Sequence, residues 1–214
     1  MYTLRILALG LIVAFAAPVH AASPDELITP IQTRWAEIKY QEPEKDQAEQ
    51  YHALALEAHA LLERNPDSAE VLIWEGIVLS SEAGAKGGLG ALSLAKQARE
   101  KLEKALELND LALNGSAYTS LATLYAKVPG WPIGFGDEER AENYFKRSLA
   151  INPAGIDPNF FYAEYLIEHE RVNDARVHLD KALIAPPRPG RELADEGRRA
   201  EIKALLATLD KDAK

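Results

Sequence analysis

The chain of 214 residues contains no cysteine. This absence excludes a disulfide framework, a zinc knuckle, an iron–sulfur site and a thiol nucleophile. Basic residues are in the minority, because 24 Lys and Arg stand against 33 Asp and Glu, a formal charge of −9. A nucleic-acid binder needs a basic surface to meet phosphates, so we expect no nucleic-acid partner. Alternating β-branched runs are also missing, and no strand is predicted.

Motifs that carry chemistry are absent as well. No serine lies in a GxSxG elbow, and there is no HExxH motif. The segment GAKGGLG does not fit a phosphate-binding loop, because Lys86 is followed by Gly87 and not by Ser or Thr. His52 and His59 lie two turns apart on one expected helix, too far to chelate one metal together. We therefore predict no catalytic residue, no metal, no cofactor and no enzymatic activity.

The beginning of the chain has the layout of a secretory signal peptide. A single cation, Arg5, precedes an apolar run of twelve residues from Ile6 to Ala17, and small residues surround Ala21. A membrane-spanning helix needs about 20 apolar residues. We therefore predict a leader at 1–21 that is cleaved near Ala21, a periplasmic or secreted protein at 22–214, and no stable membrane anchor.

The rest of the chain has the periodicity of helices, with apolar residues every three to four positions. Asp137 before two glutamates predicts a helix start, and Asn152 before proline predicts a helix end. The expected helices cover residues 28–41, 46–64, 68–82, 90–108, 115–127, 138–151, 158–169, 172–184 and 190–210.

One spacing of packing positions occurs three times. Separations of 4, 3 and 5 residues connect the members of three sets: Ala98, Leu102, Ala105 and Asp110; Ala141, Phe145, Ser148 and Pro153; Ala175, Leu179, Ala182 and Pro187. The helix before each set carries a small residue where two helices must approach closely, namely Gly76, Ala122 and Ala163. Ser148, Glu75 and Asn159 are polar departures from this otherwise apolar pattern.

These helix pairs resemble the tetratricopeptide repeat, a unit of 34 residues, which is also the separation of Ala141 from Ala175. The strings KLEKALELND, YFKRSLAINP and HLDKALIAPP look like its second helix and exit turn. The resemblance covers about residues 28–210. It implies an all-α fold in one domain: a right-handed superhelix of antiparallel helix pairs, with about three to four repeats, a C-terminal capping helix and no sheet.

Glycine-rich insertions interrupt two of the repeats, near 84–90 and 129–137, and they hold seven of the 13 glycines. Equivalent loops of consecutive repeats lie side by side, so we expect both insertions on one edge, where they would form a composite binding surface. Its candidate contact residues are Lys86, Trp131, Ile133 and Phe135. The aromatic side chains either remain exposed there or fold back into a gap in the stacking, and the sequence leaves both open.

Two carboxylates interrupt apolar helices, Glu75 in VLIWEGIVL and Glu164 in FFYAEYLI. A charge in such a stretch is costly unless it is paired. For Glu75 we favour a structural ion pair between helices. For Glu164 an ion pair and a place on the inner, concave face are equally open. In the second case the helical spacing makes Thr119, Thr123 and Phe160 its neighbours in a groove.

Two functions remain. Helical repeats hold proteins or peptides on a concave surface, so the first is a non-catalytic binding scaffold or adaptor in the cell envelope. The second function is suggested by a resemblance in overall layout, because the interrupted repeats are similar to the periplasmic T-component (TatT-like) proteins of TRAP transporters. That likeness implies a ligand-binding accessory protein, a solute-binding protein as partner, and a small apolar or carboxylate-bearing ligand. An enclosed apolar pocket would favour the small ligand, and an open channel a peptide.

Overall fold

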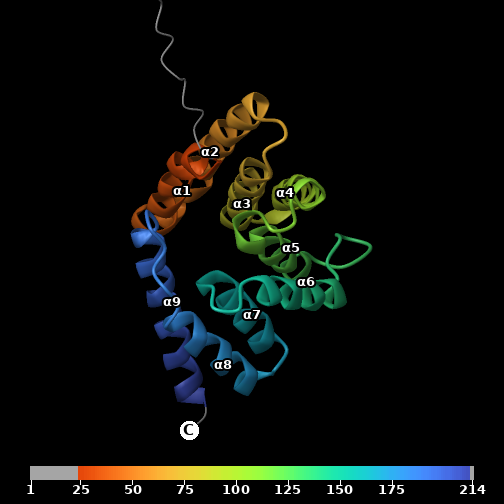
Figure 1. The fold of residues 1–214 in the computed structure, drawn as a ribbon. Coiled ribbons are helices and arrows are strands. Elements are labelled where there is room, and N and C mark those ends of the chain that lie inside the picture. Colours follow the sequence, from red (N-terminus) through yellow and green to blue (C-terminus); the bar gives the residue numbers. More distant parts are fainter. Residues whose placement is uncertain (1–23, 213–214) are drawn as a thin grey trace, which may run out of the picture.

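The computed structural model describes residues 24–212, in which helices joined by short connections form an all-α fold, as predicted (Figure 1). The helices are α1 (Pro24–Gln41), α2 (Glu44–Arg64), α3 (Ala69–Lys86), α4 (Gly88–Leu108), α5 (Ser116–Lys127), α6 (Glu138–Ile151), α7 (Ile156–Glu168), α8 (Val172–Leu183) and α9 (Glu192–Asp212). Within this range the only β pairing is an isolated bridge between Gly130 and Gly136, and none of these helices could span a membrane. The predicted signal peptide lies outside the described residues.

The three expected helix pairs are α3 with α4, α5 with α6, and α7 with α8, and the two helices of each pair pack closely together. The small residues of the spacing pattern lie in these contacts and are buried: Gly76, Ala98, Ala122, Ala141, Ala163 and Ala175. At Gly76 a β-carbon would lie only 2.7 Å from the Cγ atom of Leu102, so the approach of α3 to α4 requires glycine there.

Each polar departure from the pattern has hydrogen-bond or ionic partners. Ser148 is fully buried in α6, and its hydroxyl is hydrogen-bonded to that of Thr119 in α5. The Asn159 amide is equally buried and donates to the carbonyl oxygens of Pro153 and Gly155, at 3.0 and 2.9 Å. These partners offset the desolvation of polar groups inside a core.

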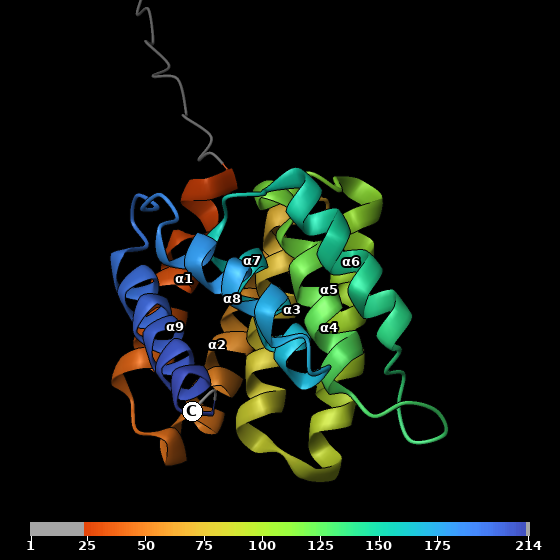
Figure 2. The same cartoon turned by 90° about the horizontal axis from the view of Figure 1, so that it is seen from below.

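The odd-numbered helices form a closed inner ring. In this ring α1 contacts α3, α3 contacts α5, α5 contacts α7, α7 contacts α9, and α9 returns to α1. The even-numbered helices pack against the ring as a partial outer layer (Figures 1 and 2). The helix predicted as a C-terminal cap therefore does more than cover α8, because it joins the end of the chain to its beginning.

A close approach of backbone to side chain makes the contact between α9 and α1. A β-carbon at Gly197 would lie 2.4 Å from ring carbons of Tyr40, so only glycine fits beneath this ring. One turn further along α9, Glu201 accepts a hydrogen bond from the Tyr40 hydroxyl (3.3 Å) and forms an ion pair with Lys39 (3.5 Å). Packing and charge thus both hold α9 against α1.

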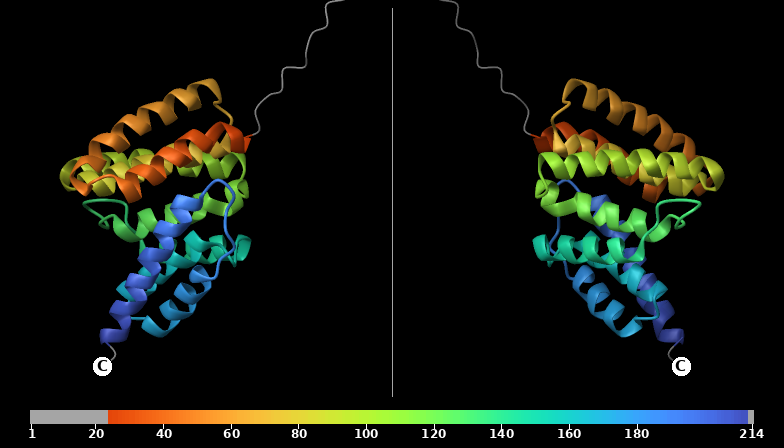
Figure 3. Two further views of the ribbon diagram at one scale, coloured as in Figure 1. Left: turned by 90° about the vertical axis from the view of Figure 1, so that its left-hand side faces the viewer. Right: turned by 90° about the vertical axis from the view of Figure 1, so that its right-hand side faces the viewer.

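The first glycine-rich insertion is not the loop that the sequence suggested. Residues 84–90 extend α3 and α4, and only Gly87 separates the two helices. Gly87 and Gly88 have positive φ (62° and 64°) and make the turn, whereas Gly84 and Gly90 lie inside helices. The second insertion, 129–137, does form a loop, and it lies on the same edge of the molecule as the α3–α4 turn (Figure 3).

We predict that Gly76→Leu lowers the free energy of unfolding by about 3 kcal/mol, because the added side chain must displace the buried Leu102. The melting temperature should fall by about 6–12 °C. Gly84→Leu is the matched control in the same helix, because nothing lies within 4 Å of a β-carbon there. The control should be neutral or stabilising by up to about 1 kcal/mol. Equal effects of the two variants would show that the α3–α4 contact is misplaced.

Candidate functional site

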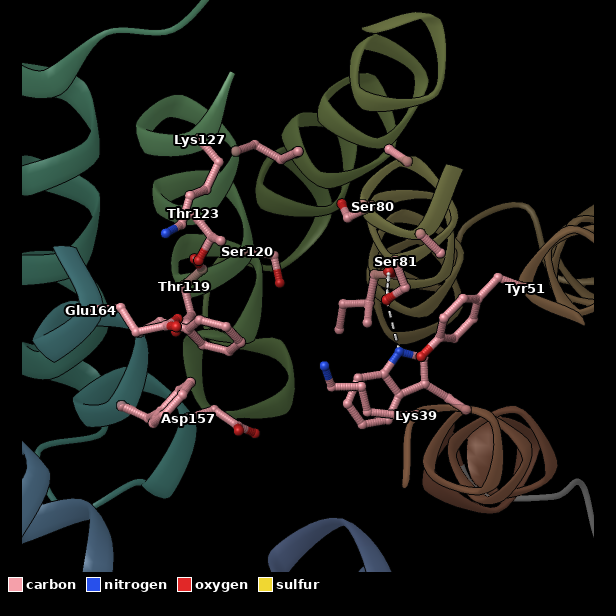
Figure 4. Close-up of a pocket in the computed structure, with 18 of the residues that line it drawn as sticks. Lys39, Tyr51, Ser80, Ser81, Thr119, Ser120, Thr123, Lys127, Asp157 and Glu164 are labelled. Atoms are coloured by element: carbon pink, nitrogen blue, oxygen red, sulfur yellow. Dashed lines mark hydrogen bonds between the residues drawn. The ribbon is translucent and has the colours of Figure 1, made fainter. Parts of the chain in front are cut away.

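The inner ring surrounds a cavity of about 1420 Å³, larger than the roughly 300–1,000 Å³ typical of small-ligand pockets. All five ring helices contribute to its wall, with additional residues from α2, α4 and the loop after α5. Figure 4 shows side chains of α5 and α7 on one side and of α1, α2 and α3 on the other, facing each other across the space. The concave face of the helical array is therefore a half-open cavity that α9 bounds on one side.

Aromatic side chains provide much of the apolar wall. Trp35 and Trp74 meet edge to face, with their centroids 6.1 Å apart, and the Trp35 indole N–H donates to the Ser81 hydroxyl (2.8 Å). Phe160 and Phe161 of α7 form a second edge-to-face pair, 5.3 Å apart. Such large, fixed rings suit contact with the apolar body of a ligand.

Hydroxyl groups of α5 line another part of the wall. Thr119 is paired with Ser148, and the Thr123 hydroxyl donates to the Thr119 carbonyl oxygen (3.0 Å). Both hydroxyls therefore make hydrogen bonds within the protein. Ser120 lies between them, half-buried, and its side chain points into the cavity (Figure 4).

A network of arginines and carboxylates lies where α7 meets α9. Arg188 binds Asp157 (2.6 Å) and Asp195 (2.7 Å), and Arg198 binds Asp157 (3.1 Å) and Glu201 (2.7 Å). The Arg198 guanidinium also covers the rings of Phe160 and Phe161, at 4.3 and 4.6 Å. Although burial raises the pKa of Asp157, Arg188 and Arg198 outweigh it and lower that pKa to about 2.

Arg191, just before α9, differs from these arginines. It lies over the ring of Trp74, 4.9 Å from the centroid, and it lines the cavity. Among residues 24–212 its side chain has no ion pair and no hydrogen bond, and its Nε atom is buried without a partner. Burial and the neighbouring Arg188 lower its pKa to about 10, against the opposing attraction of Asp157 and Asp195. At neutral pH Arg191 is therefore a cation with no paired anion.

The two carboxylates singled out in the sequence lie in different environments. Glu75 is 3% exposed and binds Lys101 (2.9 Å) and His59 (3.0 Å), which confirms the favoured ion pair between helices. Glu164 lines the cavity, and within the described range it has no ion pair. Burial raises its pKa, against the opposing effects of Lys127 and Arg198.

Of the two alternatives that the sequence left open for the loop aromatics, Trp131 remains exposed and Phe135 folds back onto the core. The Trp131 side chain is 90% exposed and Ile133 is 69% exposed. Phe135 instead folds back onto the core, where its ring meets Tyr125 edge to face (5.5 Å) and lies beneath the Arg99 guanidinium (4.5 Å). The loop therefore presents one large aromatic residue to solvent and uses the other for packing.

The cavity brings together five of the eight residues predicted to bind a ligand or partner. These five are Thr119, Thr123, Ile133, Phe160 and Glu164, whereas Lys86, Trp131 and Phe135 do not contribute to its wall. The sequence reasoning missed the arginine network. A signal for it was present, because residues 188–199 contain four arginines in a chain of net negative charge.

The histidines of α2 act as partners of buried carboxylates. His52 contacts Glu82 and His59 contacts Glu75, each at 3.0 Å through Nδ1. Over residues 24–212 no group of three or more His, Asp or Glu side chains is arranged to hold a metal ion.

No protein-family model matches this chain, and no curated protein does so either. A functional proposal must therefore be argued from the geometry of the cavity and the loop.

We predict that Trp131→Ala changes the free energy of unfolding by less than about 0.5 kcal/mol, because the side chain is exposed. Phe135→Ala should cost about 1–2 kcal/mol, because it removes the contacts with Tyr125 and Arg99. Urea unfolding of both variants measures the difference. A larger loss for Trp131→Ala than for Phe135→Ala would contradict this division of the loop.

We predict that Asp157→Asn destabilises the fold by about 2–4 kcal/mol at neutral pH, because it leaves Arg188 and Arg198 without a shared anion. The folded-state pKa of Asp157, about 2, lies below the ordinary 3.8, so its stabilisation is present above about pH 4 and is lost as the pH falls through 2. The difference between wild type and variant should therefore shrink across this interval in urea titrations.

Asp110→Asn is the control for this experiment. Asp110 forms an exposed ion pair with Arg147 (3.5 Å), and its loss should cost less than about 0.5 kcal/mol. A difference between wild type and Asp157→Asn that does not change with pH would show that Asp157 acts through packing and not through its charge.

Proposed function

We propose that this protein is a non-catalytic binding protein of the cell envelope, and that it holds a small, largely apolar molecule inside the helical ring. The observation that carries the proposal is the cavity of about 1420 Å³ with aromatic walls. A peptide-binding repeat array needs an open concave face along which an extended chain can lie. Here α9 crosses to α1 and bounds that face, which favours a compact ligand over a peptide.

The export and family parts of the proposal rest on the sequence. The signal-like segment at 1–21 supports an envelope location, and the 34-residue spacing supports a tetratricopeptide-like array. An accessory protein of a TRAP-type transporter (TatT-like) would combine such an array with a ligand cleft. The paired packing of α3–α4, α5–α6 and α7–α8 is compatible with this assignment.

A second candidate function is docking of a protein partner on the loop 129–137. Trp131 and Ile133 are exposed there, and exposed apolar residues next to a cavity are typical of contact surfaces. Under the transporter proposal the partner would be a solute-binding protein. The Trp131→Ala variant, which should keep its fold, tests this: it should lose a co-purifying envelope protein that the wild type retains.

We predict that the purified protein binds the neutral, apolar fluorophore N-phenyl-1-naphthylamine, and that Ser120→Trp weakens this binding at least about tenfold by filling the cavity. The matched control is Ala150→Trp on α6, which is exposed and belongs to a helix that contributes nothing to the cavity wall. Fluorescence titration gives both affinities. Equal binding by Ser120→Trp and wild type would mean that the cavity is not the binding site.

A further inference from the structure

The cavity wall has a cluster of charged side chains at its α9 end. Three arginines, Arg188, Arg191 and Arg198, lie there with two carboxylates, Asp157 and Asp195. Glu201 binds Arg198 (2.7 Å) and Lys39 (3.5 Å), and Glu164 of α7 interacts electrostatically with Arg198. Arg188 and Arg198 form direct ion pairs with the carboxylates, whereas Arg191 interacts with Asp157 and Asp195 only at longer range and forms no direct ion pair.

An unpaired guanidinium is costly away from bulk water, because it has lost hydration without gaining an anion. In the described part of the chain Arg191 contacts the face of Trp74 and is attracted by Asp157 and Asp195 without a direct ion pair or side-chain hydrogen bond to either. It adjoins a cavity large enough to admit a ligand, so an anionic group of that ligand could reach it. Guanidinium binds carboxylates through two parallel N–H donors, which gives both strength and orientation.

A second polar atom without a partner belongs to the same wall. Tyr51 is 2% exposed and lines the cavity, and its hydroxyl has no hydrogen-bond partner. Arg191 and the Trp74 ring beneath it line the same cavity as Tyr51. A buried hydroxyl without a partner favours a ligand that brings an acceptor.

We infer that the cavity binds an amphipathic monocarboxylate, whose carboxylate pairs with Arg191 and accepts a hydrogen bond from Tyr51, and whose apolar body lies against Trp74 and Phe160. This inference rests on the proposed function and specifies its ligand class. One negative charge matches the one guanidinium of the wall that has no direct ion pair, whereas a doubly charged phosphate monoester would bring a second negative charge next to Asp157 and Asp195. Glu164, the other unpaired charge of the wall, has the opposite sign and would favour a cationic ligand instead.

Three ligands with the same tail and different headgroups test the inference: decanoate, decanol and decyltrimethylammonium. Isothermal titration of the wild-type protein should show decanoate binding about tenfold or more tighter than decanol, and decyltrimethylammonium weakest. Tighter binding of decyltrimethylammonium than of decanoate would overturn the inference in favour of Glu164. If decanol binds as tightly as decanoate, the proposed function stands and the carboxylate inference fails. If none of the three binds, the proposed function itself fails.

Substitutions then test the residues. Arg191→Gln should weaken decanoate binding about tenfold to a hundredfold and leave decanol binding unchanged, and Tyr51→Phe should weaken decanoate binding a few-fold. Arg64→Gln is the matched control, because Arg64 is an exposed arginine at the end of α2, away from the cavity. Arg191→Lys keeps the charge without the planar fork and should lose less affinity than Arg191→Gln. Unchanged decanoate binding by a folded Arg191→Gln protein would overturn the assignment.

Discussion

The contact between the last helix and the first is the constraint on which the rest of the architecture depends. Helix pairs stacked by their small residues could extend indefinitely, because each pair contacts only its neighbours. In this protein α9 returns to α1, with Gly197 beneath Tyr40 and Glu201 between Tyr40 and Lys39. The stack therefore ends after three regular pairs, and its concave face becomes the wall of a cavity. Both the volume of that cavity and the chemistry at its α9 end follow from this one contact.

The polar groups of the molecule divide into two kinds according to how they are satisfied. Ser148, Asn159 and Glu75 replace apolar residues in helix contacts, and each has partners on a neighbouring helix or turn. The Arg191 side chain and the Tyr51 hydroxyl have no hydrogen bond and no direct ion pair in the described part of the chain, and both belong to the cavity wall. The other buried atoms there without a hydrogen-bond partner, on Glu75, Glu82 and Arg99, belong to side chains that form ion pairs. Since buried polar groups are nearly always hydrogen-bonded, groups of the second kind indicate interactions made with something outside the fold.

The spacing of small and large residues predicted the helices and their pairing, because both depend on residues close in sequence. It could not predict the ring, because Tyr40 and Glu201 are 161 positions apart and meet only through the accumulated rotation of the intervening pairs. Counting glycines led to the wrong prediction of a loop at 84–90, since Gly84 and Gly90 adopt helical conformations and one turn residue suffices. The repeat register predicts which residues of α5 and α7 face inward, and it therefore identified four residues of the cavity wall: Thr119, Thr123, Phe160 and Glu164. Arg191 lies in the connection before α9, which the register does not describe.

The proposed ligand would also link binding to the closure of the ring. Arg191 directly precedes α9, and the neighbouring Arg188 connects Asp195 of α9 to Asp157 of α7. A carboxylate bound to Arg191 and Tyr51 would give Arg191 a direct anionic partner and would join the connection before α9 to α2 on the cavity wall. A ligand that binds only the closed arrangement stabilises that arrangement by a free energy that grows with the logarithm of the ligand concentration divided by Kd. A filled cavity would therefore strengthen the α9–α1 contact, because opening the ring would then require release of the ligand.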